Sequence, residues 1–207
     1  MTKILAKTLI LLSASLIFAC SPKETPAPSP ESASMPAGPQ DEFMANLRSH
    51  CGKAYAGKLV SDDAADQDMK NLPMVMQVNC ATDAIRIPFS VGDNRSRTWV
   101  FTKTEAGLRL KHQHNHEDGS EDVVSQYGGD TAKPGPTNTN NGNRQEFPVD
   151  AFSIALFLQE GLDVSVTNIW AVEITPVIYA YELKRKNRHF RVEFDLTQQV
   201  PTPPKPW

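Results

Sequence analysis

Three histidines alternate with polar residues in the segment LRLKHQHNH, which covers residues 108–116. Side chains two residues apart point to the same side of a β-strand, so His112, His114 and His116 should follow Leu108 and Leu110 towards the core or its rim. Neutral imidazole is a ligand of zinc and copper, and two imidazoles spaced in this way can reach one ion. The spacing therefore allows a zinc or copper site at these three histidines.

The histidine segment is similar in part to known metal sites. A His-x-His pair on a strand resembles part of the zinc site of carbonic anhydrases and of the metal site of cupins. The likeness covers only His112 and His114, or His114 and His116. Those families need a further, distant ligand, for which the sequence offers several candidates: His50, His189, Glu117 and Glu121.

A second interpretation of the histidines needs no metal. Acidic residues at 117, 118, 121 and 122 follow the strand and are available to pair with imidazoles. The histidines would then be structural or would line a ligand cavity, and a patch of them would be sensitive to pH near neutrality. We favour this interpretation, with metal binding as the alternative.

Arg97 and Trp99 are further candidates to line a ligand cavity, because they lie one strand earlier in the chain. Arg95 and Arg97 flank Ser96, and two guanidinium groups close together can form an anion site at a cavity mouth. The alternative is that both arginines are solvated residues near a turn.

Cys51 and Cys80 are the two cysteines that follow Cys20 in the chain. Two such cysteines in an exported domain predict a disulfide. Closing a loop of this length would stabilise the fold by about 3–4 kcal/mol in the chain-entropy model. The alternative is two buried free thiols. No Cys-x-x-Cys motif points to a catalytic thiol.

Apolar residues with a period of two predict antiparallel strands with one buried side. The expected strands span 74–80, 85–91, 97–102, 108–116, 168–175, 177–184 and 188–196. Helices are expected over 41–50 and between Asp150, a good N-cap, and Gly161, a good C-terminal stop. Apolar residues on more than one side of the second helix predict its burial against the sheet: Phe152, Ala155, Leu156 and Leu158. Residues 128–144, rich in Gly, Pro and Asn, are expected to form a mobile loop.

These elements predict an α+β, mainly β fold. We expect one domain with a curved antiparallel meander sheet or half-barrel and two helices. The architecture looks like that of lipocalin-type and fatty-acid-binding-type barrels, although no motif of those families is present. The segment from Leu108 to Thr131 also resembles a block in uncharacterised exported proteins of Gram-negative bacteria.

The first 20 residues have the pattern of an export signal. Lys3 and Lys7 precede an apolar run that is too short to span a bilayer. Ile17-Phe18-Ala19-Cys20 resembles the lipobox of bacterial lipoproteins. That resemblance implies cleavage before Cys20, acyl chains on this cysteine and a membrane anchor. Ser21, rather than Asp, favours the outer membrane, facing the periplasm.

Composition divides the chain further. Residues 1–19 form the predicted signal peptide, and residues 20–40, with many prolines, form a tether after the lipidated cysteine. Residues 41–200 form the β-rich domain, and 201–207 a second Pro-rich tail. The net charge of −3 becomes two units more negative without Lys3 and Lys7, which disfavours nucleic acid as a partner.

Common enzyme signatures are absent from the sequence. There is no Gly-x-Ser-x-Gly, His-Glu-x-x-His or Walker motif. We therefore expect a non-enzymatic envelope lipoprotein that binds a small molecule or maintains the envelope. The alternative is a metalloprotein or metalloenzyme using the three histidines. A third hypothesis is an assembly partner that docks an envelope protein through a sheet edge or the 128–144 loop.

Overall fold

Alternation with a period of two gives the last strand, residues 188–200, one buried and one more exposed side. Phe190, Val192, Phe194 and Leu196 in the last strand all lie in the core, as predicted. The computed structural model describes residues 38–131 and 141–207. No helix among these residues is long and apolar enough to cross a membrane. The predicted signal peptide, Cys20 and nearly all of the tether lie outside the described residues.

The elements follow one another in the order α1 (Pro39–Arg48), β1 (Ala54–Leu59), η1 (Ala64–Met69), β2 (Met74–Gln77), β3 (Asn79–Cys80), β4 (Ala84–Val91), β5 (Asn94–Thr104), β6 (Gly107–His114), β7 (Tyr127–Asp130), β8 (Arg144–Pro148), α2 (Ala151–Gln159), η2 (Asp163–Thr167), β9 (Ile169–Ile174), β10 (Ile178–Arg185) and β11 (Arg188–Val200), where η denotes a 3₁₀ segment.

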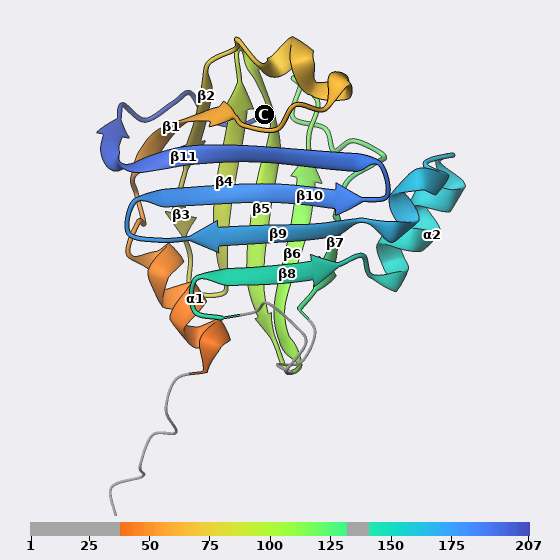
Figure 1. Ribbon diagram of the computed structural model, residues 1–207, viewed down its shortest axis with the longest axis horizontal. Coiled ribbons are helices and arrows are strands. Elements are labelled where there is room, and N and C mark those ends of the chain that lie inside the picture. Colours follow the sequence, from red (N-terminus) through yellow and green to blue (C-terminus); the bar gives the residue numbers. More distant parts are fainter. Residues whose placement is uncertain (1–37, 132–140) are drawn as a thin grey trace, which may run out of the picture. The chain divides into compact units, whose positions relative to one another are not determined.

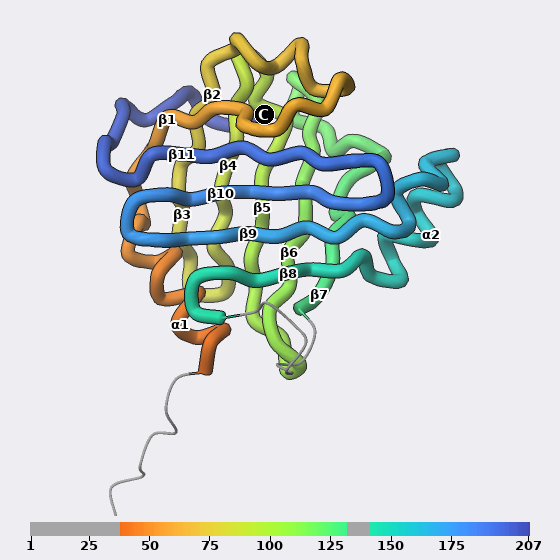
Figure 2. The backbone as a smooth tube through the Cα atoms, in the orientation of Figure 1, coloured from red at the N-terminus to blue at the C-terminus, as the bar shows by residue number. Residues whose placement is uncertain are grey.

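Ten of these strands form one antiparallel path in the order β7-β6-β5-β4-β2-β1-β11-β10-β9-β8, and β3 pairs with β4 beside it. In Figure 1 strands β8–β11 cross in front of β4–β6, and β1 and β2 connect the two layers. The smooth backbone trace in Figure 2 shows the same wrapping. The domain is thus a single, mainly-β, nearly closed barrel with two short helices, which confirms the predicted fold class.

The seam of the barrel lies between β7 and β8, where a single bridge joins Gly129 to Val149. The two backbones approach closely: a Cβ atom on Gly129 would lie 1.9 Å from the carbonyl oxygen of Pro148. Tyr127–Asp130 is therefore a strand, and the expectation that the 128–144 loop begins at Gly128 is wrong. Glycine is needed at both positions because Gly129 meets Pro148 at the seam, and a Cβ atom on Gly128 would lie 1.9 Å from the carbonyl oxygen of Leu110 in β6. Residues 132–140 of that loop lie outside the described residues.

Large side chains fill the barrel interior. The fully buried ones include Tyr55, Phe101, Phe147, Trp170 and Tyr179. Helix α1 covers one end of the barrel, and Phe43 and Leu47 enter the core from it. Cys51, just after this helix, is bonded to Cys80 in β3, so the predicted disulfide is confirmed.

Helix α2 has the predicted ends but not the predicted burial. The Asp150 side chain accepts a hydrogen bond from the Ser153 amide at 2.9 Å, and Gly161 has a φ of +69° at the C-terminal end. However, only Ser153 and Phe157 of the helix are buried, while Phe152 and Leu158 are about half exposed. The helix lies outside the barrel wall beside β7, so only one narrow side meets the core (Figure 1).

The C-terminal segment after Val200 lies along the outside of the barrel. Arg95 of β5 donates to the carbonyl oxygen of Lys205 at 2.8 Å, and the Trp207 amide donates to the carbonyl oxygen of Arg95 at 3.3 Å. The Arg95 guanidinium also sits over the Trp207 ring. Arg95 is thereby held by the tail.

Candidate functional site

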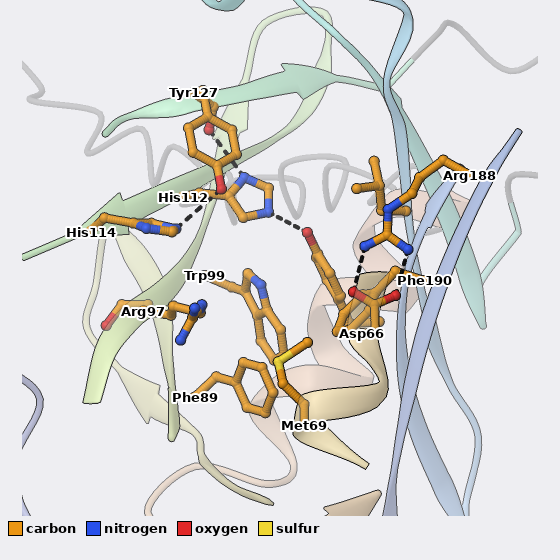
Figure 3. A pocket seen from close by; sticks show the side chains of 13 residues that line it. Asp66, Met69, Phe89, Arg97, Trp99, His112, His114, Tyr127, Arg188 and Phe190 are labelled. Carbon is orange, nitrogen blue, oxygen red and sulfur yellow. Dashed lines mark hydrogen bonds and ion pairs between the residues drawn. The ribbon is translucent and has the colours of Figure 1, made fainter. Parts of the chain in front are cut away.

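A cavity of about 290 Å³ opens beside η1 (Figure 3). This volume lies at the lower end of the range for small-molecule pockets. The cavity is lined by Asp66, Met69, Phe89, Arg97, Thr98, Trp99, His112, His114, Tyr127, Tyr181, Leu183, Arg188 and Phe190.

Strand register places the predicted residues on one wall of this cavity. In the β5–β6 ladder Arg97 lies opposite His114, and Trp99 lies opposite His112. Tyr127 comes from β7, where it lies opposite His112 on the other side. The facing wall comes from β10, β11 and η1. Two of the predicted histidines thus lie together with both predicted ligand-lining residues.

His112 is a neutral, fully engaged side chain. Its Nδ1 lies 3.1 Å from the carbonyl oxygen of Tyr127 and its Nε2 lies 2.7 Å from the hydroxyl of Tyr181. A carbonyl oxygen only accepts, so Nδ1 donates, and in the neutral ring Nε2 accepts from the Tyr181 hydroxyl. Burial lowers the pKa of His112 to about 3, with His114 and Lys111 adding to the effect. Both nitrogens are therefore occupied by the protein itself.

His114 lies closer to the rim and is also neutral at physiological pH. Burial, with the nearby Arg97 charge, lowers its pKa to about 4. Its Nε2 is hydrogen-bonded to the Tyr127 hydroxyl at 3.1 Å. Burial raises the pKa of Tyr127 to about 12, so this phenol keeps its proton.

His116 does not join the other two histidines. Strand β6 ends at His114, two residues before the predicted end, and the chain turns away through Asp118 and Gly119. The His116 side chain is 58% exposed and lies 3.8 Å from a carboxylate oxygen of Asp122. The interpretation that all three share an inward face is wrong, because the strand's alternation stops where its pairing stops.

The described residues contain no group of three or more His, Cys, Asp or Glu side chains placed to hold a metal ion. The candidates for a distant ligand are engaged elsewhere. His50 bonds to the Tyr55 hydroxyl, His189 bonds to Glu182, and Glu121 accepts from Ser125 and Gln126. Glu117 is exposed in the turn after β6. The spacing therefore brings no three-ligand zinc or copper site together in this part of the chain.

A stack of aromatic rings stiffens the wall. Trp99 is sandwiched between Phe89, at 4.8 Å between ring centroids, and Tyr181, at 4.4 Å. A second stack joins His112 and Tyr127 at 4.6 Å. Since these rings pack against one another, they hold each other in place and the wall of the cavity keeps its shape.

Across the cavity, a buried ion pair ties η1 to the barrel. The Asp66 carboxylate accepts two hydrogen bonds from the Arg188 guanidinium, at 2.5 and 2.6 Å. The Asp66 side chain is 4% exposed. Arg188 also donates to Asp63 at 2.9 Å. In Figure 3 this pair lies on the opposite side of the cavity from Arg97 and His114.

Sequence reasoning did not identify this second wall. Asp66 and Arg188 are 122 residues apart, and no local pattern connects them. Tyr127 was missed because two glycines follow it and suggested a loop. The sequence signal that could have identified Tyr127 as a site residue was its aromatic ring, close in the chain to the histidine segment.

Fold and cavity together define a class: a small antiparallel barrel with a cavity beside the 3₁₀ segment η1. No family model matches the chain, and no curated protein and no solved structure is significantly similar to it. No relative therefore supplies a function. The proposals below depend on the geometry of the cavity and on the sequence motifs.

Proposed function

We propose that this chain is an envelope lipoprotein, anchored at Cys20, that binds a small organic molecule in the cavity beside η1. The observation that carries the proposal is the cavity itself. It combines a preformed aromatic wall with a few polar groups from Arg97, His114 and Tyr127. Apolar pockets with a small number of placed polar groups are typical of ligand sites.

The state of His112 supports binding rather than catalysis. A general base must offer a free nitrogen to its substrate. His112 is 3% exposed, and both of its nitrogens are hydrogen-bonded within the protein. Its role is to hold Tyr127 and Tyr181 in place, so that the wall keeps its shape.

The cavity proposal can be tested by filling the cavity. Leu183 lines it and is only partly buried, so Leu183→Trp should occupy the space. The full chain would be purified from membranes, and the small molecules released on denaturation would be identified by mass spectrometry. Val123→Trp, at a 65% exposed position that is not part of the lining, is the matched control.

We expect a stoichiometric compound with the wild type and the control, and none with Leu183→Trp. Release of the same compounds from all three proteins, or of none from the wild type, would contradict binding in this cavity.

The anchor is a separate part of the proposal, supported by the lipobox-like Ile17-Phe18-Ala19-Cys20. Cys20→Ala should abolish incorporation of labelled palmitate and leave the signal segment uncleaved, which is visible as a larger mass. Unchanged labelling would contradict lipidation at this residue. Cys51 and Cys80 cannot substitute, because they are bonded to each other.

A further inference from the structure

The charges that line the cavity do not cancel. Asp66 and Arg188 neutralise each other through two hydrogen bonds. The two lining histidines are neutral, since burial holds the pKa of His112 and of His114 far below 7. Arg97 is the remaining charged side chain of the lining. Among the side chains that line the cavity, Arg97 therefore carries the one positive charge that no lining carboxylate matches.

Arg97 has few partners of its own. Its guanidinium donates one hydrogen bond, to the side-chain oxygen of Asn94 at 3.1 Å. Within residues 38–131 and 141–207 it forms no ion pair with a carboxylate, whereas Arg109, Arg144, Arg188 and Arg191 each do. Its other N–H groups remain available to a ligand, and a guanidinium presents them in a geometry that matches a carboxylate.

The groups around Arg97 favour an anion over a cation. His114, directly opposite in the ladder, is uncharged and so does not compete with Arg97 for an anion. Beyond the lining, Asp63 is bonded to Arg188. Asp122 also lies outside the lining, and its charge acts on His114 and Tyr127. Its carboxylate is engaged by the Val124 amide at 2.7 Å and lies near His116. It does not pair with Arg97.

The other lining residues indicate which kind of ligand body fits the cavity. Met69, Leu183 and Phe190 are apolar and come from three separate elements. Both faces of Trp99 are covered by other rings, so a ligand meets the edge of this stack. A compact apolar group fits this space, and the small volume excludes a long chain that is fully enclosed.

We propose that the ligand is a small organic monocarboxylate, with its carboxylate on Arg97 and its apolar body between the Trp99 stack and Met69, Leu183 and Phe190. This inference rests on the proposed function, since it assigns a chemical class to the ligand of the same cavity. One unmatched guanidinium selects one negative charge. The Asp66–Arg188 pair across the cavity offers no unmatched cation to a second anionic group.

The test compares acids with their uncharged isosteres. The full lipidated chain in lipid nanodiscs would be titrated calorimetrically with 2-naphthoate and 2-naphthamide, and with octanoate and octanamide. Empty nanodiscs give the background. Arg97→Gln removes the proposed partner. Arg95→Gln, on the same strand but held by the C-terminal tail, is the matched control.

We expect at least one acid to bind the wild type about ten- to a hundredfold more tightly than its amide, as for a charge-assisted hydrogen-bonded pair. Arg97→Gln should remove this preference, Arg97→Lys should restore part of it, and Arg95→Gln should leave it unchanged. Equal affinity for acid and amide, unaltered by Arg97→Gln, would overturn the carboxylate assignment and leave cavity binding intact. No saturable binding of any of the four probes by the wild type would overturn both proposals.

Discussion

Arginines occupy two contrasting environments in this barrel. On the outer side of strands β8–β11, Arg144 contacts Glu146, Glu173 and Glu182, and Arg191 contacts Glu173 and Glu193. At the cavity, Arg97 contacts no carboxylate among the described residues. In the outer network each arginine contacts at least two carboxylates, whereas the arginine at the cavity contacts none. The outer arginines therefore stabilise the fold, and the guanidinium of Arg97 is available to a ligand.

The pKa values of Glu182 and of the two cavity histidines show the same contrast. Burial alone would raise the pKa of Glu182, but hydrogen bonds from Lys184, Arg144 and His189 outweigh it and lower this pKa to about 2. His112 and His114 have no carboxylate partner in the cavity, so burial lowers their pKa. The outer face thus stabilises the charged form of Glu182, whereas the cavity favours the neutral form of both histidines.

The largest expected effect is the loss of stability in mild acid. The pKa of His112 is about 3 and that of His114 about 4 in the folded chain, against about 6.5 for an exposed imidazole. Between these values the unfolded chain binds more protons, so stability is full above pH 6.5 and falls as the pH drops. Each histidine should cost about 2 kcal/mol between pH 8 and pH 5.

Urea unfolding of the wild type and of His112→Gln and His114→Gln across this pH range measures that cost. Each variant should show a shallower decline in the free energy of unfolding between pH 8 and pH 5. His116→Gln, at an exposed position, should follow the wild type. Parallel pH profiles for all four proteins would show that the cavity does not favour the neutral form of these histidines.

The ion pair between η1 and β11 should give the next largest effect. Asp66→Asn leaves Arg188 with Asp63 as its remaining carboxylate partner. Breaking a buried ion pair in this way lowers the free energy of unfolding by about 3 kcal/mol. Limited proteolysis should then cut within residues 60–72. Asp68→Asn, exposed in the same 3₁₀ segment, is the control and should resist cleavage as the wild type does.

Removing the central carboxylate of the outer network should have a moderate effect. Glu182→Gln should lower the free energy of unfolding at pH 7 by about 1–2 kcal/mol, after allowing for screening by solvent. Because the folded pKa lies below the ordinary 4.5, this contribution is present above pH 4.5 and disappears as the pH falls towards 2. Glu105→Gln, in an exposed turn, provides the comparison. A difference between Glu182→Gln and the wild type that persisted at pH 2.5 would contradict the proposed cause.

The smallest expected effect on the free energy of unfolding is at Arg97, and it distinguishes the cavity arginine from the outer arginines most directly. Arg97→Gln should change the free energy of unfolding by less than about 0.5 kcal/mol, because the native protein gives this charge no carboxylate partner. Arg191→Gln, which leaves Glu173 and Glu193 less well matched, should cost about 1 kcal/mol. Chemical denaturation of both variants measures the difference. A large loss with Arg97→Gln would assign Arg97 to the fold rather than to a ligand.

Much of the fold could be predicted because its signals are local. Alternation identified seven strand segments, although the one expected over 74–80 is interrupted at Val78. The capping side chain of Asp150 and the left-handed backbone that glycine allows at Gly161 identified the ends of α2. Strands β1, β7 and β8 were missed. They are short or rich in glycine, and their pairing partners lie far away in the chain.

Four of the thirteen residues that line the cavity could be predicted in the same way. His112, His114, Arg97 and Trp99 lie on two strands joined by a tight hairpin, so their common wall follows from short-range pairing. His116 was misplaced, because a strand's end depends on what pairs with it rather than on its own residues.

The sequence by itself determined which side of each long strand faces the core, and it left only one possible disulfide once Cys20 is set aside. These features depend on the period of the strand and on counting. Only the tertiary structure decided that Asp66 and Arg188 cancel while Arg97 does not. Charge matching depends on distances between residues far apart in the chain, and barrel closure is what sets those distances.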